Sequence, residues 1–196
     1  MKPVLLAYAT REGHTEQIAE YVAGLIRKRG FEAELLNAAR RASGVTVHDC
    51  AGAIVAASVH RGKHQREMVE FVKEHAAELE RIPTVFLSVS LSEAGAEDAT
   101  ATAKKRAQSA ADASRLIDEF LEETGWNPGK IRAVAGALLY TKYNFLLRLI
   151  MKRIARAAGA GLDTSRNYDY TDWGALDQLV DEFIGHLGVG ALAAAK

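Results

Sequence analysis

Short apolar runs alternate with longer segments of helical period along most of this chain, and this alternation restricts the fold more than any other feature. We expect strands at residues 4–8, 31–36, 52–57, 84–89 and 131–139, and helices at 15–29, at 65–80, around Leu116 and Phe120, and at 175–187. Strands separated by helices pair in parallel through right-handed crossovers, with helices on both faces of the sheet. The sequence therefore predicts an α/β fold with a doubly wound sheet of five parallel strands, and a ligand site beyond their carboxyl ends.

The length and composition of the chain predict one domain. Its 196 residues, 48% of them hydrophobic, can bury one sizeable core, and we expect the domain to span residues 1–187. The stretch 140–172 is longer than a normal connecting loop and is interpreted as an insert after the fifth strand. Residues 188–196 are expected to form a disordered tail.

Charge and cysteine content argue against several classes of function. The 25 basic and 25 acidic residues cancel, so a general nucleic-acid binder is not expected. The single cysteine, Cys50, can form neither an internal disulfide nor a cysteine metal cluster, and the histidines lack metal-ligand spacing, so no metal is expected. Without a signal-peptide pattern or an apolar run of about 20 residues, the protein is expected to be cytoplasmic, with at most peripheral contact to the cytoplasmic membrane.

A hydroxyl-rich turn with one glycine follows the first strand and leads into a helix. The turn consists of Thr10, Arg11, Glu12, Gly13, His14 and Thr15. Backbone N–H groups of such a turn and of a helix N-terminus point at an anion, and the two threonine hydroxyls can donate to its oxygens. The alternative is an ordinary threonine-capped helix, but a cap at Thr15 does not account for Thr10 and Gly13. We interpret the turn as a phosphate site.

Other phosphate-binding motifs do not fit this turn. It lacks the G-x-x-x-x-G-K-[ST] and G-x-G-x-x-G patterns of nucleoside triphosphate and dinucleotide sites. It has no cysteine to act as a phosphatase nucleophile, and Ala57 and Ser58 end the third strand where a phosphoacceptor domain needs an aspartate. A single phosphate monoester is the ligand that fits.

The pattern T-x-x-G-x-T-x-x-x-A, formed by Thr10, Gly13, Thr15 and Ala19 after a strand, resembles the FMN-phosphate signature of flavodoxins. Ala7 departs from the family, which usually has a larger residue there, and this departure concerns strand packing. The resemblance implies a flavodoxin-like fold, with the five strands in the order 2-1-3-4-5, and FMN as the cofactor.

In flavodoxins the loops after the third and fourth strands hold the flavin ring. The corresponding residues of this chain are Ser58, Val59, His60, Arg61 and Gly62, followed by Ser88, Val89 and Ser90. Neither loop contains Trp or Tyr, so we expect His60 to stack on the ring and Gly62 to allow close backbone approach. Arg61 or Lys63 near N1 and O2 of the ring would favour two-electron chemistry and attract an anionic substrate. The alternative is a solvated basic loop.

The insert carries a local excess of positive charge. Residues 137–162 contain no acidic residue and five basic ones, Lys142, Arg148, Lys152, Arg153 and Arg156. On a helical wheel Tyr143 and its apolar neighbours span one arc, with three of the cations opposite, which predicts a basic amphipathic helix. Three uses stay open: packing on the core, reversible attachment to an anionic membrane surface, or a wall of the site for an apolar substrate that carries carboxylates.

Several further segments extend the resemblance over nearly the whole chain. With the stretches 124–128, 135–140 and 170–173 and the S-V-x-x-G-x-H pattern of residues 58–64, the chain is similar to the bacterial quinone-dependent protoporphyrinogen IX dehydrogenases. The resemblance implies an FMN enzyme of haem biosynthesis that oxidises protoporphyrinogen IX to protoporphyrin IX and passes electrons to menaquinone or ubiquinone. Arg61, Lys63 and Lys142 would meet the propionates of the substrate, and the catalytic acid and base stay unassigned.

Two other functions of the same fold stay open. The first is a flavin or quinone reductase that uses NAD(P)H, which would be indicated by rapid reduction of the flavoprotein by that donor. The second is a non-enzymatic electron-transfer or redox-sensing module, which would bind a protein partner and turn over no small substrate.

Overall fold

The computed structural model describes residues 2–40, 46–142 and 163–194. The main sheet contains five parallel strands, β1 (Val4–Ala9), β2 (Ala33–Asn37), β3 (Gly52–His60), β5 (Thr84–Ser90) and β6 (Lys130–Ala135). They lie in the order β2-β1-β3-β5-β6. The predicted α/β class, the parallel pairing and the strand order 2-1-3-4-5 are therefore confirmed.

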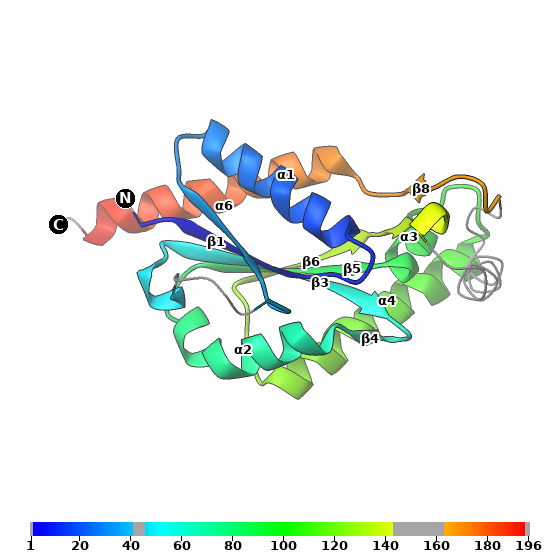
Figure 1. Ribbon diagram of the computed structural model, residues 1–196, viewed down its shortest axis with the longest axis horizontal. Helices are drawn as coiled ribbons and strands as arrows, with labels where there is room; N and C mark the ends of the chain where they lie inside the picture. Colours follow the sequence, from blue (N-terminus) through cyan, green and yellow to red (C-terminus); the bar gives the residue numbers. More distant parts are fainter. Residues whose placement is uncertain (1, 41–45, 143–162, 195–196) are drawn as a thin grey trace.

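Helices cover both faces of the sheet, as Figure 1 shows. On one face lie α1 (His14–Lys28) and α6 (Trp173–Ala194), and on the other lie α2 (Arg66–Leu79) and α4 (Ala103–Thr124). A 3-10 turn, η1 (Val47–Asp49), precedes β3. Because both faces are covered, β1 is buried along its whole length and its sequence is a continuous apolar run rather than an alternating one.

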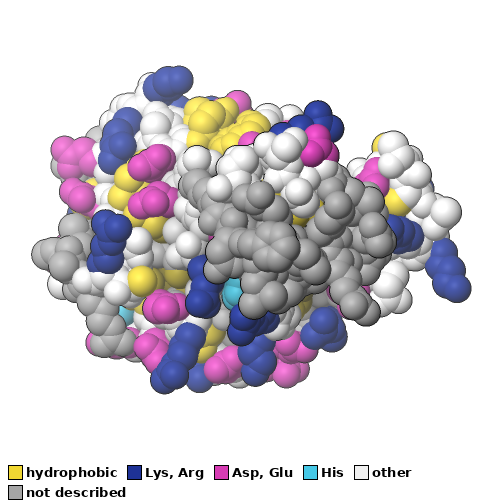
Figure 2. All heavy atoms as spheres, turned by 45° about the vertical axis from the view of Figure 1, so that its right-hand side comes forward, with side chains coloured by type: hydrophobic (Ala, Val, Ile, Leu, Met, Phe, Trp, Pro, Cys, Tyr) yellow, Lys and Arg dark blue, Asp and Glu magenta, His cyan; other side chains and the backbone are white. Residues whose placement is uncertain are grey.

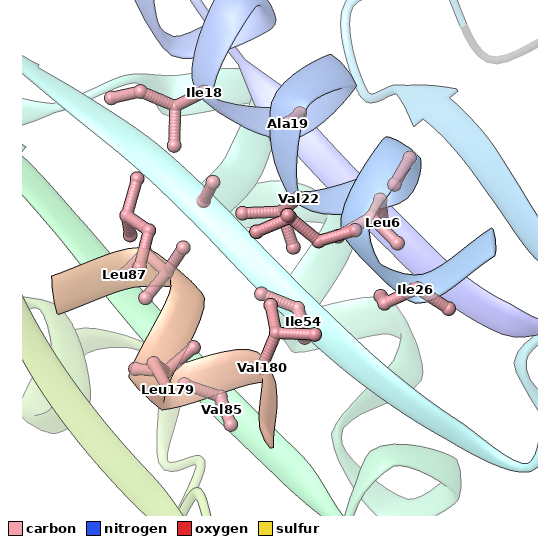
Figure 3. Close-up of a cluster of buried hydrophobic side chains, with 14 of the residues drawn as sticks. Leu6, Ile18, Ala19, Val22, Ile26, Ile54, Val85, Leu87, Leu179 and Val180 are labelled. Atoms are coloured by element: carbon pink, nitrogen blue, oxygen red, sulfur yellow. The ribbon is translucent and has the colours of Figure 1, made fainter. Parts of the chain in front are cut away.

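The core on the α1 side shows how helical spacing turns into packing. Ile18, Val22 and Ile26 recur every four residues, so they share one face of α1 and point at the sheet. They meet Ile54 of β3, and α6 adds Val180 to the same cluster (Figure 3). Each such side chain contributes roughly 1.5–3 kcal/mol relative to leaving it exposed. This packing holds the N-terminal end of α1 against the end of β1, where the predicted phosphate site lies.

The segment after residue 57, predicted as a loop, forms a β-hairpin. β3 continues to its end at residue 60, and β4 (Lys63–His64) pairs back on it in antiparallel register, with Val59 opposite His64. The two connecting residues, Arg61 and Gly62, have φ angles of 52° and 77°, and positive φ at both positions is what a type I′ turn requires. Gly62 is therefore needed by the turn itself.

A short helix follows β5, where the sequence predicted only a polar loop. α3 (Leu91–Glu97) begins after Ser90, whose hydroxyl accepts the backbone N–H of Glu93 at 3.1 Å. This bond satisfies one of the N–H groups that a helix leaves unpaired at its start. The S-x-x-E pattern of residues 90–93 is a known signature of a helix start, so the sequence contained the signal for α3.

The fifth strand ends at Ala135, earlier than predicted. Gly136 donates its N–H to the Ser90 carbonyl at 2.9 Å, and a Cβ at this position would lie 3.4 Å from that carbonyl, so the backbone passes close to the end of β5. The chain continues as β7 (Ala137–Leu138), which pairs with β8 (Tyr168–Asp169) in a separate two-stranded sheet. The pairing brings the two ends of the predicted insert side by side.

Most of the insert lies outside the described residues. Its first residues form a 3-10 turn, η2 (Tyr140–Lys142). The predicted amphipathic helix lies within residues 143–162, outside the described part of the chain. The same holds for four residues that we predicted to contact substrate or membrane: Tyr143, Arg148, Lys152 and Arg156.

The closing helix is longer than predicted. α6 runs to residue 194, so residues 188–194, expected to belong to a disordered tail, continue the helix. The alanines in this stretch favour a helix and no proline interrupts it, whereas Gly188 and Gly190 each cost only about 1 kcal/mol relative to alanine. The expectation of disorder rested on the position of these residues at the end of the chain, and the continuation of α6 overrides it up to residue 194.

Candidate functional site

A cleft opens at the carboxyl edge of the main sheet, where a doubly wound fold binds its ligands. Its lining comes from four strand ends: Thr10, Glu12, His14 and Thr15 follow β1, Ser58, Val59 and His60 end β3, Val89, Ser90 and Leu91 lie at the end of β5, and Gly136 and Ala137 follow β6. Parallel strands end at the same edge, and this brings segments more than 100 residues apart in the sequence into one site.

The loop after β1 is shaped by its own hydrogen bonding. Thr10 Oγ1 accepts the backbone N–H of Gly13 at 2.9 Å, which leaves the threonine O–H as a donor. Gly13 has a φ angle of 93°, in the left-handed region that favours glycine, and α1 begins at the next residue. The first N–H groups of α1 have no partner within the helix, so the loop presents a helix N-terminus and a hydroxyl to the cleft.

Thr15 is the residue of this loop that most clearly points to a ligand. Its side chain lies in the first turn of α1 and is fully buried, yet its hydroxyl oxygen has no hydrogen-bond partner among the described residues. A buried hydroxyl without a partner costs about 1–3 kcal/mol. Because Thr15 lines the cleft at a helix N-terminus, an anionic oxygen of a ligand is the partner that would remove this cost.

His14, predicted as a cofactor ligand, directs its imidazole toward the segment that returns from the insert. Its Nε2 atom lies 2.7 Å from Thr171 Oγ1 and 3.5 Å from Asp169 Oδ1, and the ring packs edge-on against Trp173. Thr171 donates its own proton to the carbonyl of Ala135 at 2.8 Å, so His14 Nε2 is the donor in the pair. His14 therefore ties the loop to β8 and the residues that follow it.

The end of β3 forms a second wall of the cleft. Nδ1 of His60 lies 3.5 Å from Oε1 of Glu12, which links this strand end to the loop after β1. Ser58 donates its hydroxyl to the carbonyl of Ala9 at 3.3 Å, so it fixes the two strand ends to each other. His60 lines the cleft, as the prediction of a stacking residue requires, and Arg61 is exposed at the tip of the hairpin.

Ser88 and Lys63, two further predicted contact residues, do not line the cleft. The hydroxyl of Ser88 lies 2.9 Å from Nε2 of His64, and Lys63 borders a separate cavity between the hairpin and the helices α2 and α4. Side chains alternate between the faces of a strand, so Ser88 faces α2 and α4 while Val89 packs in the cluster under α1. Ser88 and Lys63 therefore belong to the opposite side of the sheet from the cluster under α1.

The cleft also contains residues that the sequence did not single out. Leu91 belongs to α3, the helix that was not predicted. Gly136 and Ala137 follow the fifth strand, so the rule that ligands bind beyond the carboxyl ends of the strands could have found them. On α3, burial raises the pKa of Glu93, and the positive charge of Arg132 opposes this shift. The carboxyl edge thus carries an acid whose proton affinity is above its ordinary value.

Side chains of both charges lie on the face of the molecule that contains this edge. Figure 2 turns the edge toward the viewer and shows Lys and Arg side chains interspersed with Asp and Glu. No group of three His, Cys, Asp or Glu side chains among the described residues is placed to hold a metal ion. Within the same residues, no helix has both the length and the apolar composition needed to cross a membrane.

Known proteins similar to this chain can now be compared with it. The flavodoxin domain family matches residues 5–165. An Escherichia coli protein named protoporphyrinogen IX dehydrogenase (quinone) is 30% identical over 183 residues, which are 93% of this chain and 94% of that protein. The chain belongs to this dehydrogenase family within the flavodoxin domain proteins. The resemblance inferred from the sequence is confirmed, and so is the prediction of an oxidoreductase.

One further relative carries the same name, and one solved structure shares the fold. A Leishmania major protein with the same name is 27% identical over 180 residues, which are 91% of this chain and 73% of that protein. A solved structure of a flavo di-iron protein variant from Thermotoga maritima covers 95% of this chain and 36% of its own, with a TM-score of 0.51 and 11% identity. The second relationship supports the fold alone.

A flavin is the cofactor that the flavodoxin domain implies, and the cleft fits one. The unpartnered Thr15 hydroxyl and the N-terminus of α1 suit an anionic group, whereas Val59, Val89 and Leu91 give the neighbouring lining an apolar surface that suits a flat ring. The cleft of this chain therefore has one end suited to an anionic group and one apolar end.

Proposed function

We propose that this protein oxidises protoporphyrinogen IX to protoporphyrin IX, with FMN as its cofactor and a quinone, menaquinone or ubiquinone, as the electron acceptor. The observation that carries the proposal is the buried, unpartnered hydroxyl of Thr15 at a helix N-terminus, inside a cleft built from four strand ends. The names of the relatives support the choice of substrate and acceptor.

The chain's own residues have distinct tasks in binding. Thr10 and Thr15 would donate their hydroxyl protons to the phosphate of FMN, together with the first N–H groups of α1. Val59, Val89 and Leu91 would contact the ring and exclude water from it. When bound, FMN supplies the two-electron oxidation by accepting a hydride from the substrate.

Two exposed arginines would bind the propionates of the substrate. Arg11 lies on the loop after β1 and Arg61 at the tip of the hairpin after β3, next to residues that line the cleft. An arginine can bind a carboxylate through two parallel hydrogen bonds, which fixes its orientation. Of the two lysines predicted for this role, Lys63 borders another cavity, and the side chain of Lys142 is outside the described part of the structure.

The stoichiometry follows from the chemistry of the substrate. Protoporphyrinogen IX loses six electrons and six protons on its way to protoporphyrin IX, so three two-electron rounds reduce three quinones to three quinols. Quinones are held in membranes, so the predicted peripheral contact with the cytoplasmic membrane would bring the protein to its electron acceptor. That contact stays a prediction from the basic insert, whose residues 143–162 are not described.

An anaerobic assay tests the proposed reaction. FMN-loaded protein with protoporphyrinogen IX and a soluble quinone should produce fluorescent porphyrin faster than the uncatalysed control, with three quinones reduced per porphyrin. A double Arg11→Gln, Arg61→Gln variant should raise KM for the porphyrinogen and change kcat little. Arg66→Gln is the matched control, because Arg66 is an equally exposed arginine that pairs with Glu70 on α2.

The assay separates the proposal from the other functions. Porphyrin formation no faster than the control would reject the reaction, while release of FMN from the denatured protein would still support the cofactor. Rapid reduction by NAD(P)H without porphyrinogen oxidation would assign the chain to the reductases instead. Protein that binds no FMN would reject the whole proposal.

A further inference from the structure

A second cavity of about 520 Å³ lies behind the hairpin, between β4, α2 and α4. Its apolar lining comes from Val69, Leu116 and Phe120, and its polar lining from Lys63, His64, Glu119, Glu122 and Glu123. None of these residues lines the cleft at the carboxyl edge. The volume lies in the range of small-molecule sites, which are concave and mostly apolar with a few polar groups.

His64 gives this cavity a defined polar point. The residue is 8% exposed, its Nε2 atom lies 2.9 Å from the Ser88 hydroxyl, and its ring packs against Phe86 and Phe120 at centroid distances of 5.5 and 4.9 Å. The other ring nitrogen, Nδ1, has no hydrogen-bond partner among the described residues. It does not belong to the fully buried side-chain atoms that lack a partner. His64 lines the cavity, so its imidazole lies beside that space.

The imidazole is neutral under ordinary conditions. Burial lowers the pKa of His64 to about 4. A neutral imidazole with one nitrogen engaged by Ser88 can offer one hydrogen bond, as donor or acceptor according to its tautomer. The floor of the cavity is therefore uncharged and can form a single directional bond to a ligand.

The carboxylates at the rim are largely balanced by cations outside the cavity. Arg115 lies 2.6 Å from Glu119, and Lys73 lies 3.5 Å from Glu123. These neutralising pairs leave no net positive field that would attract a dianionic tetrapyrrole. A flat, uncharged ring that packs on Phe120 and bonds to the imidazole is the ligand chemistry that fits.

We infer that this cavity binds the ring of the quinone acceptor, separately from the porphyrinogen. The inference rests on the proposed function, which supplies the quinone. A quinone oxygen would bond to the imidazole, and the ring would lie against an aromatic and two aliphatic side chains. The two sites meet at the hairpin, in which Val59 lines the cleft and its register partner His64 lines the cavity.

The electron balance of this arrangement is complete. In each round the quinone takes up two electrons and two protons and leaves as a quinol, while the reduced flavin in the cleft loses two electrons and two protons. Electrons cross the hairpin, and protons are released and taken up from water at the two mouths. Because the sites differ, porphyrin and quinone should bind at the same time.

The two tryptophans of the chain make a direct binding test possible. The Trp126 ring lies 5.9 Å from that of Phe86, which stacks on the cavity residue Phe120 at 4.4 Å, whereas Trp173 lies on the opposite face beside His14. Menadione is titrated into FMN-loaded Trp173→Phe protein, which has Trp126 as its only tryptophan. We expect saturable quenching of Trp126 that excess protoporphyrin IX does not reverse.

Variants decide whether the quinone occupies the cavity. His64→Phe keeps an aromatic ring but loses the polar nitrogens, and we expect menadione to bind about five- to tenfold more weakly, as loss of one hydrogen bond predicts. Val69→Phe fills the cavity from α2, leaves the His64 pair with Ser88 intact, and should weaken binding at least tenfold. His75→Phe is the matched control, because His75 lies on α2 but does not line the cavity, and it should bind normally.

Each outcome bears on one of the two proposals. Unchanged menadione affinity in both His64→Phe and Val69→Phe, or displacement of menadione by protoporphyrin, would overturn the second site and leave the proposed reaction untouched. Normal binding in wild type and weak binding in both variants, without any porphyrinogen oxidation, would support the site and reject the reaction. A Trp126→Phe protein retains Trp173 as its only tryptophan. If menadione quenches Trp173 in that protein as strongly as it quenches Trp126 in the Trp173→Phe protein, the site would also be overturned.

Discussion

Replacing Thr15 by valine should change stability and cofactor binding in opposite directions. Valine keeps the shape of the side chain and removes the hydroxyl, which is fully buried and has no partner among the described residues. The unpaired hydroxyl costs about 1–3 kcal/mol, so Thr15→Val should stabilise the FMN-free protein. We expect a gain of about 1 kcal/mol in the free energy of unfolding, because small shifts of the surrounding atoms already relieve part of the cost. An ordinary buried threonine would behave in the opposite way.

The effect on FMN should be larger and of the other sign. A hydrogen bond to a charged group contributes about 1.5–3 kcal/mol, and the Thr15 hydroxyl is placed to donate to the dianionic phosphate. Its loss should therefore weaken FMN binding by roughly 10- to 100-fold. The backbone N–H groups of α1 remain in the variant, so binding should be weakened and not abolished.

Two measurements and one control test this prediction. Urea unfolding of FMN-free protein gives the stability, and fluorescence titration with FMN gives the affinity, for wild type and Thr15→Val. The matched control is Thr124→Val at the end of α4, where the buried hydroxyl donates to the Phe120 carbonyl at 2.8 Å. The control should lose about 1 kcal/mol of stability, because it removes the bond from the Thr124 hydroxyl to the Phe120 carbonyl and the acceptor of the Trp126 N–H, and it should bind FMN normally.

The reasoning would be refuted by either of two results. If Thr15→Val lowers the stability of the FMN-free protein as much as Thr124→Val does, the Thr15 hydroxyl has a partner within the fold and is not reserved for a ligand. If FMN affinity stays within twofold of wild type, the phosphate does not bind at the N-terminus of α1, and the assignment of the cleft fails.

Three further predictions concern the fold around the site. Burial lowers the pKa of His64 from 6.5 to about 4. Stability that is fully present above pH 6.5 should therefore fall by on the order of 3 kcal/mol as the pH drops from 6.5 to about 4. In urea unfolding, a His64→Phe variant should lack this part of the pH dependence. Gly52→Ala should lower the free energy of unfolding by about 1–3 kcal/mol, since the new Cβ would lie 2.8 Å from Phe183, and an unchanged melting temperature would contradict this. Ser90→Ala removes the hydroxyl that caps α3 at Glu93 and should cost about 1 kcal/mol, whereas Ser90→Asp should retain the cap in the same unfolding assay.

Much of the fold, and the turn that leads from the first strand into the first helix, was predictable from the sequence. The alternation of apolar runs with helical periodicity predicts the parallel strands, and the fixed handedness of their crossovers limits the order in which they can pair. The spacing of Thr10, Gly13 and Thr15 after a strand predicts an anion at a helix N-terminus, because the loop and helix are local in sequence. Such features need no information from distant residues.

Residues that meet across the fold were harder to predict. Whether Ser88 faces the cleft or the opposite layer depends on strand register, and a shift of one residue reverses the answer. Whether residues 61 and 62 form a loose loop or a type I′ turn depends on the pairing of the strands that flank them. The imidazole of His14 forms its hydrogen bond with Thr171, a partner 157 positions away.

The sequence by itself determined the class of this protein: a doubly wound α/β domain similar to quinone-dependent dehydrogenases, with a loop after its first strand that is predicted to bind phosphate. Only the tertiary structure decided how the polar residues divide between the cleft and the cavity behind the hairpin, and that the Thr15 hydroxyl is left without a partner. The physical reason is that periodicity and short motifs report on neighbours along the chain, whereas burial and pairing are set by segments that meet only when the sheet closes.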